Sequence, residues 1–265
     1  MLRTPQLQNA FRLSRRVGAA VLVTAALAAA GCASGNEPSA APTGDTLPDA
    51  VAAGSVAVAA DPALTNALTD SQSRLAVDNS SLKVKLRFVP DPSALARAGQ
   101  VDLIVGAISA LNGLQATGVV EKPVPFARDE LQIVVAPGNP LGITSAADLA
   151  RPGLRVALDP ANTAAARLLQ TVSAGPTRVA VPNSAAAISA VHDGAADATI
   201  VYASEAADGN ADLTVSVAEE LDAGRVFAIA IVKVTKQRKP AEGYIEQLVY
   251  GVGSQAVQGR GFRLP

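Results

Sequence analysis

The sequence predicts an α/β protein with two lobes, joined by two crossing strands and separated by a ligand cleft. Apolar runs of strand length alternate along the chain with helical segments that begin at capping residues. Two long extended segments, around 126–135 and 225–234, interrupt this alternation. A length of 265 residues allows one large or two modest domains. Because ligands of open α/β sheets bind beyond the carboxyl ends of the strands, two facing sheets would form a cleft.

The composition limits both the core and the partners. Aromatic residues make up 3% of the chain and hydrophobic residues 49%, so the core must be aliphatic. The formal net charge is −1, which gives no general reason to expect nucleic acid or an acidic membrane surface as a partner.

Residues 1–32 have the pattern of a targeting segment. Arginines precede an apolar stretch over 17–30, which is short for a membrane span. The stretch ends in Ala29-Ala30-Gly31-Cys32, which resembles the lipobox of bacterial lipoproteins. The resemblance implies cleavage before Cys32 and a lipid anchor on it, on the outer face of the cytoplasmic membrane. The alternative is an ordinary signal peptide with an incidental cysteine.

Residues 33–54 are rich in Ser, Pro, Gly, Ala and Thr, and they cannot bury enough apolar surface to fold. We expect them to form a flexible tether. Cys32 is the only cysteine of the chain, so no disulfide can form within it.

The first lobe is predicted from residues 55–128 together with 225–265. Asp61 can cap the first helix, with Pro62 at its first position. Residues 82–89 alternate apolar and basic side chains, which is typical of an edge strand. The expected elements are strands at 55–60, 82–89, 101–105 and 225–234, and helices at 63–74, 94–98, 107–117 and 240–257.

The second lobe is predicted from residues 129–224. The order strand, helix, strand, helix over 131–160 indicates a parallel sheet. The expected elements are strands at 131–135, 154–158, 178–181, 198–202 and 213–217, and helices at 163–172 and 185–192, with short helices near 145 and 204.

Several motifs of the second lobe resemble the periplasmic molybdate-binding proteins of ABC importers. The stretch 131–160, LQIVVAPGNPLGITSAADLARPGLRVALDP, is similar to that family's order of strand, P-x-x-N-P, S-x-x-D-L, strand and D-P. The most specific match is 194–206, GAADATIVYASEA, against G-E-A-D-A-G-I-V-Y-x-[ST]-D-A. The end of the chain, Gly261-Phe262 with Pro265, resembles the terminal G-F-x-x-P. The resemblance covers about 55–262 and implies the periplasmic-binding-protein fold with hinged closure on a ligand.

This family holds a tetrahedral oxyanion with backbone N–H groups at helix starts and a few hydroxyls, without cationic side chains. Carried over, the resemblance implies three ligands in the second lobe. They are the backbone N–H groups of Ala165 and Ser184 and the hydroxyl of Tyr202. The alternative for Tyr202 is a core tyrosine whose hydroxyl bonds to a neighbouring carbonyl.

The first lobe departs from the family's pattern at both expected serines. Ala63 and Gly106 stand at those positions, where only a backbone N–H can bind the ligand. Ser93 or Ser109 could supply a replacement hydroxyl. Asp61 would repel an anion if its carboxylate pointed into the cleft, or it could cap its helix and face away.

We therefore expect a lipid-anchored, monomeric solute-binding protein of an ABC importer, with molybdate or tungstate as ligand and a separate permease as partner. The alternatives are another anion, a small organic ligand, or an envelope lipoprotein without a transport ligand. An enzyme is not expected, because the single histidine, His192, lies near a helix end and no Ser lies in a G-x-S-x-G turn. No cofactor and no metal site are expected either, since no His/Cys cluster has metal-ligand spacing.

Overall fold

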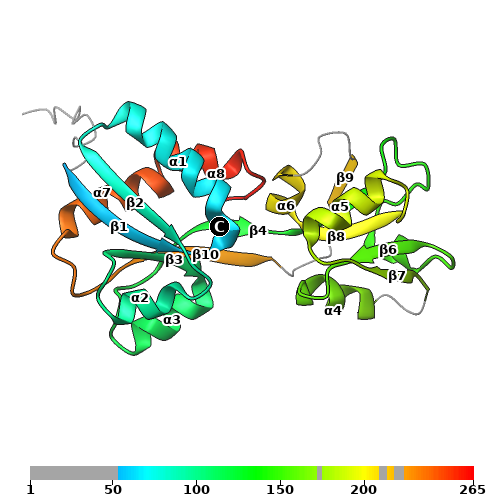
Figure 1. Cartoon of the computed structure of the whole chain (residues 1–265), viewed down its shortest axis with the longest axis horizontal. Helices are drawn as coiled ribbons and strands as arrows, with labels where there is room; N and C mark the ends of the chain where they lie inside the picture. The colour runs from blue at the N-terminus through cyan, green and yellow to red at the C-terminus, as the bar shows by residue number, and fades with distance from the viewer. Residues whose placement is uncertain (1–52, 172–174, 209–213, 218–223) are drawn as a thin grey trace, which may run out of the picture. The chain divides into compact units, whose positions relative to one another are not determined.

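Strands of the computed structural model form two sheets, each with helices on both faces (Figure 1). The structure describes residues 53–171, 175–208, 214–217 and 224–265. All of them belong to one unit of the chain, Leu47–Pro265. The predicted targeting segment with Cys32 lies outside the described residues, and so does the predicted tether apart from residues 53 and 54.

The first sheet has the strand order β2-β1-β3-β10-β4. Its strands are β1 (Gly54–Ala60), β2 (Leu82–Phe88), β3 (Leu103–Ala107), β4 (Val124–Asp129) and β10 (Arg225–Ile231). β1 is parallel to β2 and β3, whereas β10 is antiparallel to β3 and β4. The edge position predicted for β2 is confirmed, and Lys83, Lys85 and Arg87 are exposed along it.

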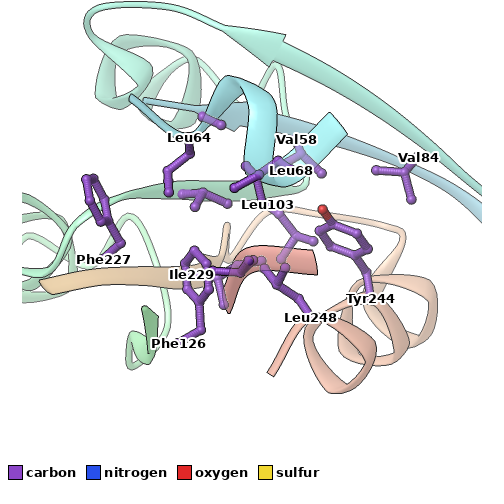
Figure 2. Close-up of a cluster of buried hydrophobic side chains, with 14 of the residues drawn as sticks. Val58, Leu64, Leu68, Val84, Leu103, Phe126, Phe227, Ile229, Tyr244 and Leu248 are labelled. Carbon is purple, nitrogen blue, oxygen red and sulfur yellow. The ribbon is translucent and has the colours of Figure 1, made fainter. Parts of the chain in front are cut away.

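Both faces of the first sheet are covered by helices (Figure 1). One face carries α1 (Thr65–Asp78), α7 (Arg238–Val249) and α8 (Val252–Gln258), and the other carries α2 (Pro92–Arg97) and α3 (Ile108–Ala116). The apolar side chains of the first face form one cluster, which includes Phe126, Phe227 and Tyr244 (Figure 2). The lobe is therefore a three-layer sandwich around the sheet.

The second sheet has the strand order β7-β6-β8-β5-β9. Its strands are β5 (Leu131–Val135), β6 (Arg155–Leu158), β7 (Thr177–Ala180), β8 (Ala198–Tyr202) and β9 (Thr214–Val217). The helical segments are η2 (Ala146–Ala150), α4 (Thr163–Thr171), α5 (Ser184–His192) and α6 (Ala203–Asp208). Their apolar side chains pack against the two faces of the sheet in two clusters.

The parallel sheet predicted over 131–160 is wrong for its first strand. β5 is antiparallel to β8, while β6 is parallel to β8, so β5 and β6 run in opposite directions. A single residue, Glu130, separates the end of β4 from the start of β5. Its direction is therefore set by the chain crossing over from the first sheet, and the local strand–helix–strand order does not decide it.

The single terminal helix predicted at 240–257 is two helices. α7 ends at Val249 and α8 begins at Val252, with Gly251 in an extended conformation at the N-cap. A Cβ on Gly253 would lie 2.7 Å from the Ser71 hydroxyl oxygen and 2.8 Å from the Gln247 carbonyl oxygen. The break lets α8 pack closely on α1, and this approach depends on glycine at position 253.

We expect Gly253→Ala to lower the free energy of unfolding by about 1–3 kcal/mol, because the added methyl group overpacks the contact between α8 and α1. Urea denaturation followed by circular dichroism measures the change. Gly113→Ala is the matched control, since a Cβ on this glycine of α3 meets no atom within 4 Å. The control should gain up to about 1 kcal/mol from helix propensity, and equal losses in both variants would contradict the packing argument.

Candidate functional site

Helices begin at the carboxyl ends of the parallel strands in both sheets. In the first sheet β1 leads through the 3₁₀ turn η1 (Pro62–Leu64) to α1, β2 leads to α2, and β3 leads to α3. In the second sheet β6 leads to α4, β7 to α5 and β8 to α6. Helix N-termini present unpaired N–H groups and a partial positive charge. Each sheet therefore gathers anion-binding dipoles at one edge, and all the predicted ligand positions lie near these edges.

Asp61 caps the turn that follows β1. Its Oδ1 accepts a hydrogen bond from the Ala63 N–H at 2.9 Å, and its own N–H donates to the Val105 carbonyl at 3.0 Å. Of the two roles left open for Asp61, the structure shows capping. The backbone donor expected from Ala63 is consequently bonded to a carboxylate, and it could serve an anion only by giving up that bond.

The other first-lobe positions lie on β3 and at the starts of α2 and α3. Gly106 is buried in β3, opposite Ala228 of β10. The Ser93 N–H donates to Asp91 Oδ1 at 3.0 Å, so Asp91 caps α2. Ser109 is the second residue of α3 and is exposed. Both candidate replacement hydroxyls thus belong to first turns at the carboxyl edge of the sheet.

Asn162 caps α4 and accepts a hydrogen bond from the backbone N–H of Ala165, the group that the resemblance implied as a ligand. Its Oδ1 accepts from the Ala165 N–H at 3.0 Å. The Asn162 side chain is buried, with a residue exposure of 8%, and its Nδ2 has no partner among the described residues. An unpaired buried donor is costly, so this nitrogen favours any acceptor that a conformational change brings to it. The sequence signal for this residue is an Asn three positions before Ala165, a typical capping spacing.

Ser184 is the first residue of α5. The cap of α5 is Asn183, whose Oδ1 accepts from the Ala186 N–H at 2.8 Å, and the Ser184 amide has no acceptor among the described residues. A cavity of about 430 Å³ extends from Ser184 along α5 to His192 and is bounded by Glu205 and Asp208 of α6. Ser184 therefore offers a backbone donor beside a space large enough for a ligand.

Tyr202 ends β8, and the guanidinium of Arg225 lies on its ring. The guanidinium carbon is 3.8 Å from the ring centroid, a cation–π distance. Burial raises the pKa of Tyr202, and Arg225 only partly opposes this shift, so the hydroxyl is protonated at neutral pH and can donate. The Tyr202 hydroxyl has no hydrogen-bond partner among the described residues. The alternative role for Tyr202, a core tyrosine whose hydroxyl bonds to a neighbouring carbonyl, would require such a partner.

Asp129, at the end of β4, joins the two crossing strands to α6. The carboxylate is fully buried and accepts from the Ser204 N–H at 3.1 Å and the Ser204 hydroxyl at 2.7 Å. It also accepts from Arg225 Nε at 3.2 Å and Nη2 at 2.9 Å. No local sequence pattern identifies this cluster, because Ser204 and Arg225 lie 75 and 96 positions from Asp129 in the chain.

The chain is similar to known binding proteins over most of its length. The family described as bacterial extracellular solute-binding protein matches residues 56–263. The molybdate-binding protein ModA of Mycobacterium tuberculosis is 29% identical over 256 residues, which cover 92% of this chain and 97% of the relative.

Solved structures with the same fold include two from other bacteria. The substrate-binding domain of a putative molybdenum ABC transporter from Clostridium difficile has a TM-score of 0.67 at 16% identity, covering 79% of this chain and 98% of that chain. The periplasmic molybdate-binding protein of Azotobacter vinelandii has a TM-score of 0.54 at 15% identity, covering 79% and 99%. These likenesses establish the two-lobed fold that the sequence predicted.

We expect Asp129→Ala to lower the free energy of unfolding by about 3 kcal/mol, because Arg225 and Ser204 would lose the carboxylate that they share. Asp193→Ala is the control. Among the described residues, the exposed Asp193 side chain pairs only with His192, at 3.1 Å, so its loss should cost no more than about 0.5 kcal/mol. Urea denaturation at pH 7 measures both. An Asp129→Ala protein as stable as the control would show that the buried network does not hold the crossing strands.

Proposed function

The chain belongs to the family of bacterial extracellular solute-binding proteins, and from this premise we propose that it delivers molybdate or tungstate to an ABC importer. The observation that carries the proposal is the likeness to ModA over 92% of the chain. Proteins of this family bind solutes and are not enzymes. The carboxyl-edge geometry supports the same proposal, because it concentrates neutral donors where a tetrahedral oxyanion can be held.

The donors that support oxyanion binding are of two kinds. The Tyr202 hydroxyl and the Ser184 N–H are not engaged by any other described residue and could bond to an anion directly. The Ala63 and Ala165 N–H groups are bonded to Asp61 and Asn162, so they could contribute only if those caps rearranged. Gly106, Ser93 and Ser109 are the candidates from the first lobe. In this arrangement the second lobe provides the donors that no cap already occupies, and the first lobe closes over the ligand.

The location and the partner follow from the same proposal. Relatives of this kind work outside the cytoplasm, and a separate permease would receive the ligand. Cys32 would carry the lipid that holds the protein on the outer face of the cytoplasmic membrane, and 33–54 would act as the tether. Within the described residues, no helix combines the length and apolarity needed to cross a bilayer.

A second candidate function is the binding of a small organic anion by the same fold. The cavity of about 430 Å³ beside Ser184 favours it, because a tetrahedral oxyanion would leave most of this volume empty. His192 and Ile188 line the cavity together with Ser184, so it combines polar and apolar surface.

Calorimetric titration of residues 33–265 with molybdate and tungstate tests the leading proposal, with sulfate as the comparison anion. We expect micromolar or tighter affinity for molybdate. Tyr202→Phe should weaken it about tenfold or more, since a hydrogen bond to a charged ligand is worth about 1.5–3 kcal/mol. Tyr250→Phe is the matched control, because the Tyr250 side chain is 80% exposed. Absence of heat and of thermal stabilisation with all three anions would contradict the proposal and turn the search to organic acids.

The lipid anchor is tested separately with the full chain expressed in a bacterial host. The unaltered protein should partition into the detergent phase of a Triton X-114 extract, and Cys32→Ser should move it to the aqueous phase, because the acyl chains would be missing. Ser34→Ala, two residues further on, is the control and should stay in the detergent phase. A wild-type chain found only in the aqueous phase would favour the ordinary signal peptide.

A further inference from the structure

The ion pair between Arg225 and Asp129 has a definite orientation. The Asp129 side chain is 0% exposed, whereas the Arg225 side chain is 29% exposed. Two of the guanidinium nitrogens, Nε and Nη2, are taken by Asp129 Oδ2. The negative end of the pair is therefore sealed inside the protein, and the positive end lies nearer the solvent.

The positive end also lies directly on the ring whose hydroxyl we propose as a ligand. The guanidinium carbon of Arg225 is 3.8 Å from the Tyr202 ring centroid and 5.2 Å from that of Phe227, so it contacts aromatic surface as well as the carboxylate. The hydrogen bonds to Asp129 and the contacts with the two rings leave the guanidinium little freedom to move. In return, the guanidinium restricts the Tyr202 ring on one face.

A third contact fixes the backbone of the same tyrosine. The Tyr202 N–H donates to Glu205 Oε2 at 2.9 Å, and the Ala203 N–H donates to the Glu130 carbonyl at 2.8 Å. The backbone around Tyr202 is thus held by α6 and by the crossing segment, and its ring is held by Arg225. Few degrees of freedom remain for the hydroxyl.

We infer that Arg225 is a positioning and specificity-determining residue, which holds the Tyr202 hydroxyl for the ligand and makes this end of the site select dianionic over monoanionic oxyanions. The inference rests on the proposed oxyanion function. Its physical basis is that attraction to the exposed positive end grows with the charge of the ligand, whereas the neutral N–H and hydroxyl donors discriminate less by charge. The buried carboxylate balances the charge, so the empty site does not contain an unpaired cation.

Tungstate and perrhenate are the probes, because both are tetrahedral oxyanions and they carry two and one negative charges. Calorimetric titration of residues 33–265 gives the ratio of the two dissociation constants. Replacing both members of the pair, in Asp129→Asn with Arg225→Gln, avoids leaving a buried charge without its partner. We expect this double variant to lose roughly tenfold in tungstate affinity and less than about threefold in perrhenate affinity.

Arg155 and Asp197 provide the matched control. They form a similar ion pair, at 2.7 Å, but at the amino ends of β6 and β8. Asp197→Asn with Arg155→Gln makes the same two substitutions at the opposite edge of the sheet and should leave the ratio unchanged. Arg225→Lys keeps the positive charge but not the flat guanidinium. This variant should keep the preference for tungstate while lowering the affinity for both anions.

A measurement on the ligand-free protein separates this inference from the proposed function. Stacking on Tyr202 should shift the NMR signals of the Arg225 side-chain protons upfield, and Tyr202→Leu should reduce the shift to the smaller part that the more distant Phe227 ring contributes. Equal losses for tungstate and perrhenate in the double variant would overturn the specificity role and leave a structural one. If the shift is present but the wild type binds neither anion, the proposed function and the selection by Arg225 both fail, and only the clamp on Tyr202 is confirmed.

Discussion

The structure depends most on the buried carboxylate of Asp129. A carboxylate without solvent must be compensated by hydrogen bonds and an opposite charge, and its partners here come from distant parts of the chain. Arg225 begins the second crossing strand and Ser204 lies in the first turn of α6. This one group therefore joins β4, β10 and α6, so both crossings and the end of β8 are held together. The position of Tyr202, next to Ser204 in the chain, follows from that constraint.

The helix caps at the two carboxyl edges compete with any anion for the same donors. Asp61 and Asn162 already accept from Ala63 and Ala165, the residues at which the family resemblance implied backbone ligands. Binding at those amides would exchange one acceptor for another and gain little free energy. Donors that no described residue uses, such as the Tyr202 hydroxyl and the Ser184 N–H, would contribute more. The second lobe is therefore expected to supply more of the affinity than the altered first lobe.

Patterns with a short range in sequence were sufficient for most of the fold. The alternation around Lys83 and Lys85 indicates an edge strand, and the proline that follows Asp61 indicates a helix cap; the structure has both. The direction of β5 could not be predicted, because it depends on where the chain enters the second sheet. The helix break at Gly251 depends on the approach of α8 to α1, which a local helical pattern does not contain. Arg225 and Asp129 are separated by 96 positions, so only the folded chain reveals that they are partners.

One ion pair can meet two demands that usually oppose each other. Holding the crossing strands together requires a strong buried interaction, and attracting an anion requires positive potential at the surface of the site. In the Asp129–Arg225 pair the carboxylate is fully enclosed and the guanidinium is partly exposed. Under the proposed function, the same contact would provide both. A lone arginine at this place would lack compensation when the site is empty, and neutral donors alone would discriminate less between ligand charges. Under the proposed function, this potential would also offset the two first-lobe hydroxyls that Ala63 and Gly106 cannot supply.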